Sequence, residues 1–190
     1  MVGDGIFSDN SQRPTCGLVF GPEDTKAVQR LAPVFKAFVK PLSQTDREIN
    51  VFTQKTGVMQ LTSTATKAFK VLKEEHGMTP GLATTKRIPM SVFRAPKPLQ
   101  ASFLGALFSA DGSVVINRST QTYAVTLSSS FLGLLNDVQL LLNDFGIRSS
   151  WYSYPVTGRK NPQGCLWVRG FQAYKFMYLI GFLLSDKKDN

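Results

Sequence analysis

Apolar positions along the chain follow two spacings, and each spacing predicts a different kind of element. Between Thr25 and Val39 the apolar residues recur every three or four positions, which predicts an amphipathic helix, kinked or split at Pro33. A second helix is predicted over residues 65–76, ending at Gly77. Short runs at 17–21, 47–55 and 58–62 predict strands, the last two forming a hairpin around Thr56-Gly57.

The same plan repeats after residues 79–98, which hold four prolines and predict an irregular linker. The second half adds a leading helix, and its predicted elements are a helix over 99–110, strands over 113–117 and 122–127, a helix over 131–145, strands over 148–156 and 164–169, and a helix over 171–184. We therefore expect an α+β protein with an internal pseudo-twofold, its halves spanning residues 1–78 and 99–190.

Charge narrows the class of partner. The 190 residues carry 22 Lys and Arg against 13 Asp and Glu, a net charge of +9, which favours a polyanion such as nucleic acid. A basic protein without such a partner, or a protein-interaction module, is the alternative. The sequence shows no membrane-length apolar run and no secretory signal, and it has two cysteines, so we expect a cytoplasmic protein without a membrane partner.

Candidate chemistry centres on two Asp-Gly pairs, Asp4-Gly5 and Asp111-Gly112, each placed before a predicted strand. The two acids lie 111 − 4 = 107 residues apart, one in each half. If a twofold axis relates the halves, the two carboxylates can meet near it and share a divalent cation. Such a cation polarises a phosphodiester and activates water. Taken singly, each Asp-Gly pair is more typical of a turn than of a metal site.

The sequence gives little support for nucleophilic catalysis through histidine or for nucleotide binding. The single histidine, His76, lies at a predicted helix end beside Glu74 and Glu75, with no evident nucleophile for Ser–His or Cys–His catalysis. No phosphate-binding loop or dinucleotide fingerprint is present.

The residues before Asp111 resemble a known family. Lys86-Arg87-Ile88-Pro89, Phe93-Arg94-Ala95-Pro96 and the run 103–112 (FLGALFSADG) resemble the connector and second motif of the LAGLIDADG homing endonucleases of the DOD type found in inteins. Leu104, Leu107, Ala110, Asp111 and Gly112 match the motif. Ser109 replaces its first Asp, and Gly105-Ala106 invert the expected order. Gly3-Asp4-Gly5 with residues 17–24 resembles the first motif, so the resemblance spans essentially the whole chain.

The resemblance implies two αββαββα subdomains, related by a pseudo-twofold, whose antiparallel β-saddles bind the DNA major groove. The motif helices would pack together at small residues such as Gly105, Ala106 and Ala110. Residues that we expect on the groove face are polar, basic or aromatic and lie on or beside the predicted strands: Asn10, Arg13, Arg47, Gln54, Lys55, Arg118, Thr120, Gln121, Tyr152, Tyr154, Arg159, Lys160 and Arg169. Trp151 and Trp167 are expected to pack in the core or saddle.

The family also implies the catalytic set. Asp4 and Asp111 would bind Mg²⁺ or Mn²⁺, and a basic residue from each half would stabilise the developing phosphorane charge. Lys86 matches the family position in the first half. In the second half the position falls on Lys187 or Lys188, and Lys188 gives the closer spacing from its acid, 188 − 111 = 77 against 86 − 4 = 82.

The implied function is a metal-dependent, site-specific double-strand DNA endonuclease that is monomeric, with two similar halves. One departure matters: the sequence places only Met1, Val2 and Gly3 before Asp4, where a first motif helix belongs. Splicing segments or a second chain would then complete the fold. The alternative is a catalytically inactive DNA-binding module. The ends, Met1-Val2 and Asp189-Asn190, lack the residues that splicing needs.

Overall fold

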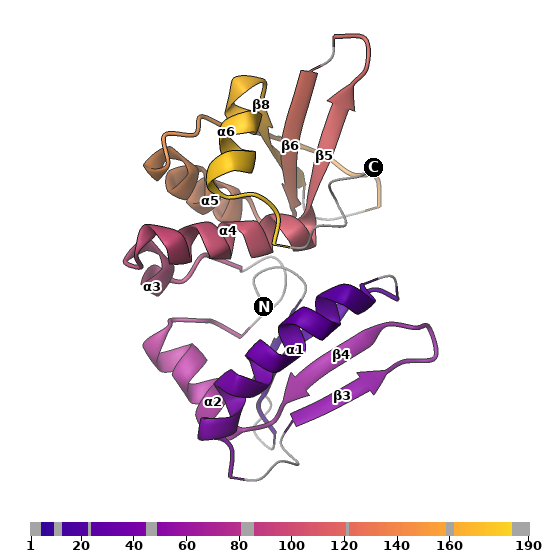
Figure 1. Ribbon diagram of the computed structural model, residues 1–190, viewed down its shortest axis with the longest axis vertical. Coiled ribbons are helices and arrows are strands. Elements are labelled where there is room, and N and C mark those ends of the chain that lie inside the picture. Colours follow the sequence, from indigo (N-terminus) through magenta and orange to yellow (C-terminus); the bar gives the residue numbers. More distant parts are fainter. Residues whose placement is uncertain are drawn as a thin grey trace. The chain divides into compact units, whose positions relative to one another are not determined.

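The computed structural model describes residues 5–9, 13–22, 24–44, 49–80, 86–120, 122–158 and 162–183. These residues belong to two compact units, unit 1 (residues 1–81) and unit 2 (residues 82–190), which are coloured in sequence order in Figure 1. Each unit has its own sheet and its own helices.

Unit 1 contains a four-stranded antiparallel sheet, sheet 1. Its strands are β1 (Gly5–Ser8), β2 (Thr15–Phe20), β3 (Ile49–Thr53) and β4 (Met59–Ser63), in the order β1-β2-β4-β3. The predicted hairpin is confirmed as β3 and β4, and Gly57 takes the positive φ of 83° that their turn requires.

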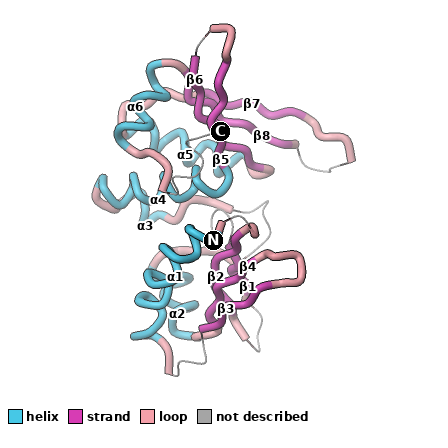
Figure 2. Tube along the Cα trace, turned by 45° about the vertical axis from the view of Figure 1, so that its right-hand side comes forward, coloured by secondary structure: helices cyan, strands magenta, loops and turns pink. Residues whose placement is uncertain are grey.

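The helices of unit 1 cover one face of sheet 1 (Figure 2). They are α1 (Thr25–Val39), which runs into the 3₁₀ turn η1 (Lys40–Leu42), and α2 (Thr66–Lys70), which continues as the π-helical turn η3 (Val71–Glu75). Phe7 of β1 stacks on Phe69 of α2, with ring centroids 4.4 Å apart. The expected split of α1 at Pro33 does not occur: Pro33 lies on the exposed side, where water can bond the carbonyl that loses its partner.

Unit 2 contains a second antiparallel sheet, sheet 2. Its strands are β5 (Gly112–Asn117), β6 (Thr122–Ser129), β7 (Ser150–Tyr154) and β8 (Gln163–Arg169), in the order β5-β6-β8-β7. This order corresponds strand for strand to that of sheet 1. The predicted α+β class, with two antiparallel four-stranded sheets backed by helices, is confirmed.

The core of unit 2 lies between sheet 2 and its helices. These are α3 (Met90–Phe93), α4 (Lys97–Asp111), α5 (Leu132–Asp144) and α6 (Phe171–Leu179). Phe108 of α4 and Phe176 of α6 are fully buried, with ring centroids 4.6 Å apart. Leu135 and Leu142 of α5 are also fully buried, so all three long helices contribute to the core.

Two elements of unit 2 differ from the sequence expectation. The proline-rich stretch is not wholly irregular, because its residues form α3 and the first turn of α4, with Pro98 in the first turn, where a missing N–H costs nothing. Helix α6 ends at Leu179 rather than at 184, because Gly181 adopts a φ of 67°. Over the described residues, no helix has both the length and the apolar character needed to cross a membrane.

Candidate nucleic-acid interface and acidic centre

Each sheet has one face that no described helix covers, which we call its open face (Figure 2). In sheet 2, a Cβ added to Gly164 would lie 2.5 Å from Leu135 and 2.7 Å from Leu132 of α5, so Gly164, Leu166 and Val168 face the helices. Alternation and strand register then assign the open face of sheet 2 to Ser113, Val115, Asn117, Thr122, Ala124, Thr126, Ser128, Ser150, Tyr152, Tyr154, Gln163, Cys165, Trp167 and Arg169.

The open face of sheet 1 follows from the same argument. Phe7 stacks on α2, so its register partner Cys16 also faces the helices. The opposite side carries Ile6, Ser8, Thr15, Gly17, Val19, Asn50, Phe52, Gln60 and Thr62.

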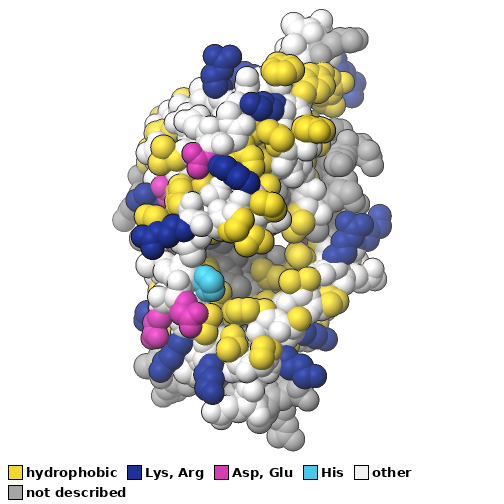
Figure 3. Space-filling view, turned by 60° about the vertical axis from the view of Figure 1, so that its left-hand side comes forward, with side chains coloured by type: hydrophobic (Ala, Val, Ile, Leu, Met, Phe, Trp, Pro, Cys, Tyr) yellow, Lys and Arg dark blue, Asp and Glu magenta, His cyan; other side chains and the backbone are white. Residues whose placement is uncertain are grey.

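The described strands carry no acidic side chain on either open face. None of the eight described strands contains Asp or Glu, and their only charged residue is Arg169. Hydroxyl, amide and aromatic side chains dominate instead. On the side of the molecule seen in Figure 3, Lys and Arg side chains are spread over the surface. Both faces can therefore approach a polyanion without charge repulsion.

The predicted DNA-binding residues of unit 2 lie in two places. Tyr152, Tyr154 and Arg169 are exposed on the open face, and the two tyrosine rings are 6.0 Å apart. Arg118 and Thr120 are exposed in the β5–β6 turn, which Asn117 stabilises by accepting hydrogen bonds from the Ser119 and Thr120 amides. The remaining predictions, Gln121, Arg159 and Lys160, fall outside the described residues.

In unit 1 the predicted residues lie beside the sheet rather than on it. Gln54 and Lys55 form the β3–β4 turn, closed by hydrogen bonds between the Gln54 amide and the Val58 carbonyl and between the Gly57 amide and the Gln54 carbonyl. Arg13 is exposed just before β2. Asn10 and Arg47 lie outside the described residues.

Several open-face residues were missed from the sequence alone, and Trp151 and Trp167 were given the same expected position although the two differ. Asn50, Gln60, Thr62, Ser113 and Thr126 all point to the open side, and the signal that could have found them is polar alternation within each strand. Trp151 faces the helices, where its Nε1 donates to Asn136 of α5 at 3.0 Å. Trp167 lies on the open face instead, and Arg169 stacks on its ring.

Asp111 is the last residue of α4, and its position depends on the glycine that follows. A Cβ on Gly112 would lie 2.4 Å from the Phe108 carbonyl oxygen and 3.0 Å from that of Thr126, so no other residue fits this passage from helix to strand. Asp111 is half-buried there. Asp4, its predicted partner, lies outside the described residues, as do Lys187 and Lys188.

The two departures from the expected motif, at Ser109 and at Gly105-Ala106, lie where α4 contacts another segment of unit 2. The hydroxyl of Ser109 is buried, donates to the Gly105 carbonyl at 2.7 Å and accepts from the Leu183 amide at 2.9 Å. Gly105 was expected to admit another motif helix. It admits the segment that follows α6, because a Cβ there would lie 3.2 Å from the Gly181 carbonyl oxygen. Ser109 and Gly105 thus hold residues 180–183 against α4.

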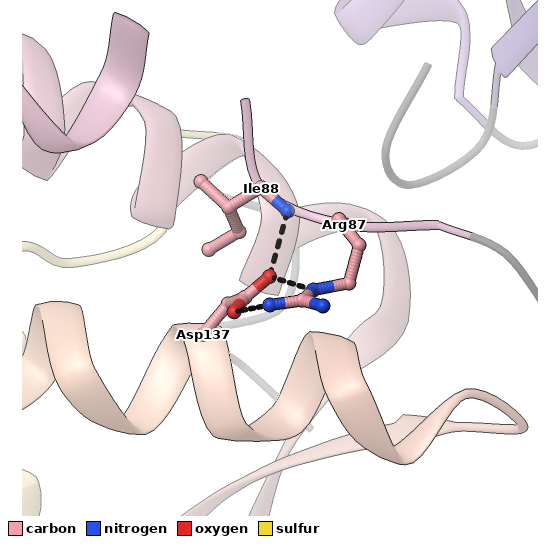
Figure 4. A network of polar contacts seen from close by, with 3 residues as sticks. All are labelled: Arg87, Ile88 and Asp137. Carbon is pink, nitrogen blue, oxygen red and sulfur yellow. Dashed lines mark hydrogen bonds and ion pairs between the residues drawn. The ribbon is translucent and has the colours of Figure 1, made fainter. Parts of the chain in front are cut away.

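A buried carboxylate holds the segment that carries Lys86. Asp137 of α5, only 5% exposed, accepts from Arg87 Nε at 2.6 Å, from Arg87 Nη2 at 2.7 Å and from the Ile88 amide at 3.1 Å (Figure 4). The hydrogen bond and the charge of Asp137 raise the pKa of Arg87. Lys86, half-buried, is therefore joined to unit 2 through its neighbour.

The described residues hold no preformed alternative centre. Among them, no three His, Cys, Asp or Glu side chains gather as metal ligands would. Burial raises the pKa of the Cys16 thiol to about 11, so this cysteine is uncharged and unsuited to attack as a thiolate. Cys165 is buried as well. Asp111 stands at the end of α4, directly before β5 of sheet 2.

Comparison with known proteins places this arrangement among characterised folds. Residues 98–181 match the family model described as LAGLIDADG-like domain. A structure of the homing endonuclease I-DmoI in complex with DNA and Mn is similar with a TM-score of 0.65 and 15% identity, over 95% of this chain and 90% of that one. The N-terminal LAGLIDADG domain of WhiA gives a TM-score of 0.51 and 18% identity, over 94% and 75%. At these identities the similarity shows the fold.

Curated relatives are much longer proteins. The tRNA-splicing ligase RtcB of Methanopyrus kandleri is 32% identical over 136 residues, 65% of this chain and 14% of the ligase. A DNA polymerase of a Thermococcus species is 28% identical over 98% of this chain and 11% of the polymerase. The reductase subunit NrdEB alpha of Bacillus subtilis is 36% identical over 47% and 8%. The chain thus spans less than a fifth of each of these relatives.

Proposed function

We propose that this chain, which has the LAGLIDADG homing endonuclease fold and carries a LAGLIDADG-like domain at residues 98–181, is a site-specific endonuclease that cleaves double-stranded DNA. The observation that carries the proposal is the pairing of two acid-free open faces with an acidic residue at the end of α4. The faces would bind the major groove, which is wide enough for β-strands. Asp111 would bind the metal ion that cleavage needs.

Asp111 suits a divalent cation. Carboxylate oxygens are the ligands that Mg²⁺ and Mn²⁺ prefer, and Asp111 stands where α4 ends. A helix C-terminus carries partial negative charge, so it favours a cation beside this carboxylate. We assign the metal to Asp111 and Asp4, and when bound it would polarise the scissile phosphate and activate water.

Two lysines complete the proposed catalytic set. Lys86 is carried by the segment that Asp137 fixes to α5, so its backbone is held in unit 2, which also contains Asp111. Lys188 is the second, with Lys187 as the neighbouring choice. Each ammonium group would stabilise negative charge that builds up on the phosphate during cleavage.

The curated relatives support an origin within an intein. A ligase, a polymerase and a reductase catalyse unrelated reactions, yet a segment of each resembles this chain. A segment shared by such enzymes is explained most simply by a module inserted into each of them. We therefore assign the chain to the intein-borne endonucleases of the DOD type, whose target would be an uninterrupted copy of a host gene.

The second candidate function is a DNA-binding module without cleavage. One observation favours it: among the described residues, no three His, Cys, Asp or Glu side chains gather as metal ligands would. The departure at Ser109 does not decide between the two functions, because we assign the metal to the motif's last acid, Asp111, and Ser109 bonds the Gly105 carbonyl and the Leu183 amide. The two candidate functions share the open faces and differ only in catalysis.

The test separates binding from cleavage. Supercoiled plasmids carrying candidate uninterrupted target genes are incubated with the protein in Mg²⁺, in Mn²⁺ and in EDTA, and binding of the same DNA is measured in parallel. We expect nicked and linear DNA with either metal and none with EDTA. Binding without cleavage in both metals selects the second function, and the absence of any sequence-specific binding refutes both.

A further inference from the structure

We infer that Arg169, held by Trp167 and Ser150, reads a guanine in the DNA that sheet 2 binds, and so determines specificity at one base pair. The inference rests on the proposed DNA-binding function. It goes further by naming one reading residue, the two residues that position it, and the base that it recognises.

The Arg169 guanidinium is fixed by two independent contacts. Its Cζ lies 4.4 Å from the centre of the Trp167 ring, a cation–π stack, and its Nη1 donates to the Ser150 hydroxyl at 3.1 Å. An exposed arginine normally samples many rotamers, and ordering it on binding costs affinity. The two contacts restrain Arg169 before any partner binds, as expected of a residue that must meet one partner in one orientation.

The contacts leave the recognition edge available. The guanidinium has five N–H donors, and the bond to Ser150 uses one of them. Arginine recognises guanine by two parallel hydrogen bonds to O6 and N7, which needs a planar group held at a defined angle. The stack on Trp167 sets the plane of the Arg169 guanidinium, and the hydrogen bond to Ser150 sets its rotation within that plane.

The surroundings favour a base over a phosphate. Across the sheet, Arg169 pairs with Ala124, which pairs with Val115, so its neighbours on the side of β6 and β5 are short and apolar. Over the described strands, Arg169 is the one charged residue on an open face. Arg169 lies on β8 itself, whereas the basic residue Arg118 is exposed in the β5–β6 turn.

Trp167 has a stacking role that can be tested separately. Its indole Nε1 is buried and makes no hydrogen bond with the residues that the structure describes. Replacing Trp167 with Leu therefore removes the ring beneath Arg169 without breaking a polar contact. Ser150→Ala removes the second contact and leaves the stack intact.

The experiment is a binding selection from a duplex library of random sequence, in EDTA so that no cleavage occurs. The full chain is compared with Arg169→Ala, Arg169→Lys, Trp167→Leu and Ser150→Ala, after thermal melting confirms that each variant folds. The matched control is Arg94→Ala, which removes the same charge from an exposed position at the end of α3. Bound and unbound DNA are sequenced.

We expect the wild-type protein to select guanine at a position where Arg169→Ala and Arg169→Lys lose the preference. A good bidentate pair discriminates by about 1–3 kcal/mol, which is a ratio of about 5-fold to about 150-fold. Trp167→Leu and Ser150→Ala should weaken the preference at that position alone, and Arg94→Ala should leave it unchanged. Replacing the selected guanine with 7-deazaguanine should weaken binding of the wild-type protein and not of Arg169→Ala.

Several results would overturn the inference. Arg169→Ala with an unchanged base preference, or with a uniform loss of affinity across all sequences, would show a phosphate contact instead. A 7-deazaguanine duplex that binds as tightly as the natural one would do the same. A wild-type protein that selects no sequence at all would refute the proposed site-specific function itself, which distinguishes that failure from the failure of the Arg169 assignment.

Discussion

The two units share one strand order and differ in how they are packed. Sheets 1 and 2 are connected identically, β1-β2-β4-β3 and β5-β6-β8-β7. Among the largest side chains that are less than 2% exposed, Val39 and Leu61 belong to unit 1, and ten belong to unit 2 within the described residues: Leu104, Phe108, Leu127, Leu134, Leu135, Leu141, Leu142, Ile147, Leu166 and Phe176. The same topology therefore does not bring the same core.

Helix α4 explains much of the difference. It precedes the first strand of unit 2 and contributes Leu104, Leu107 and Phe108 to the core. No described helix precedes β1 in unit 1. The comparison teaches that one strand order can support cores of different extent, and that in unit 2 the helix leading into the sheet contributes to the core and ends in the acid.

The largest effect on stability should come from truncating two equivalent core leucines. They lie in β4 and β8, which hold the same place in the strand order of their sheets. Leu166 of β8 is fully buried and Leu61 of β4 is 1% exposed. We expect Leu166→Ala to cost about 4 kcal/mol and Leu61→Ala about 3 kcal/mol, because the tighter core of unit 2 relaxes less around a cavity. Amide exchange resolved by residue measures both, and a larger cost in unit 1 would contradict the comparison.

The next effect concerns ion pairs. Asp137→Ala in unit 2 removes a buried acceptor of three hydrogen bonds and should cost about 2 kcal/mol. The matched change in unit 1 is Asp9→Ala. Asp9 forms an ion pair with Lys73 at 2.6 Å, but the Asp9 side chain is 43% exposed. The change should therefore lower the free energy of unfolding by less than about 0.5 kcal/mol. Denaturant unfolding of both variants measures this, and equal losses would show that burial does not set the difference.

A smaller effect tests how α4 holds residues 180–183. Ser109→Ala removes the bond from the Leu183 amide and should cost about 1 kcal/mol, with faster exchange of that amide. Ser102→Ala is the control, because Ser102 also donates to the carbonyl four residues earlier but is exposed. Similar exchange at Leu183 in both variants would mean that Ser109 does not hold the segment.

The smallest effect is a pH dependence in unit 1. Because the pKa of Cys16 is raised from 9.0 to about 11, the folded protein keeps the thiol protonated where the unfolded chain begins to lose the proton. This contribution to stability is fully present below pH 9 and is lost as the pH rises toward 11. At pH 9 the loss is about 0.4 kcal/mol. Cys16→Ala should remove this part of the pH dependence, and an unchanged pH profile in that variant would contradict the assignment.

The sequence predicted elements better than faces. Hydrophobic period gave α1 at its observed bounds and α5 within a residue at each end, since burial of one helix side demands that period. Strand register was beyond reach, because a shift of one residue reverses which side chains are open. Trp151 and Trp167 therefore could not be distinguished in the sequence, although Trp151 faces the helices and Trp167 lies on the open face beneath Arg169.

Candidate site residues were predictable where a local motif fixes them. Asp111 and Gly112 stood out because the sequence repeats an Asp-Gly pair and resembles a known motif there, and the structure shows why glycine is needed at that step from helix to strand. Asp137 was missed because it lies 50 residues from Arg87, and a single acid in an apolar helix carries no sign of its partner. Long-range polar pairs of this kind arise from the tertiary fold alone.

The most direct test of the account is cleavage by Asp111→Asn. The variant is compared with the wild-type protein on the same selected duplex, with single-turnover cleavage measured in Mg²⁺ and affinity measured in EDTA. Asparagine keeps the shape of the side chain and removes the charge that holds the cation. We predict that cleavage falls at least about 1,000-fold while affinity stays within about 3-fold. Cleavage at the wild-type rate would contradict the assignment of the active site to the end of α4.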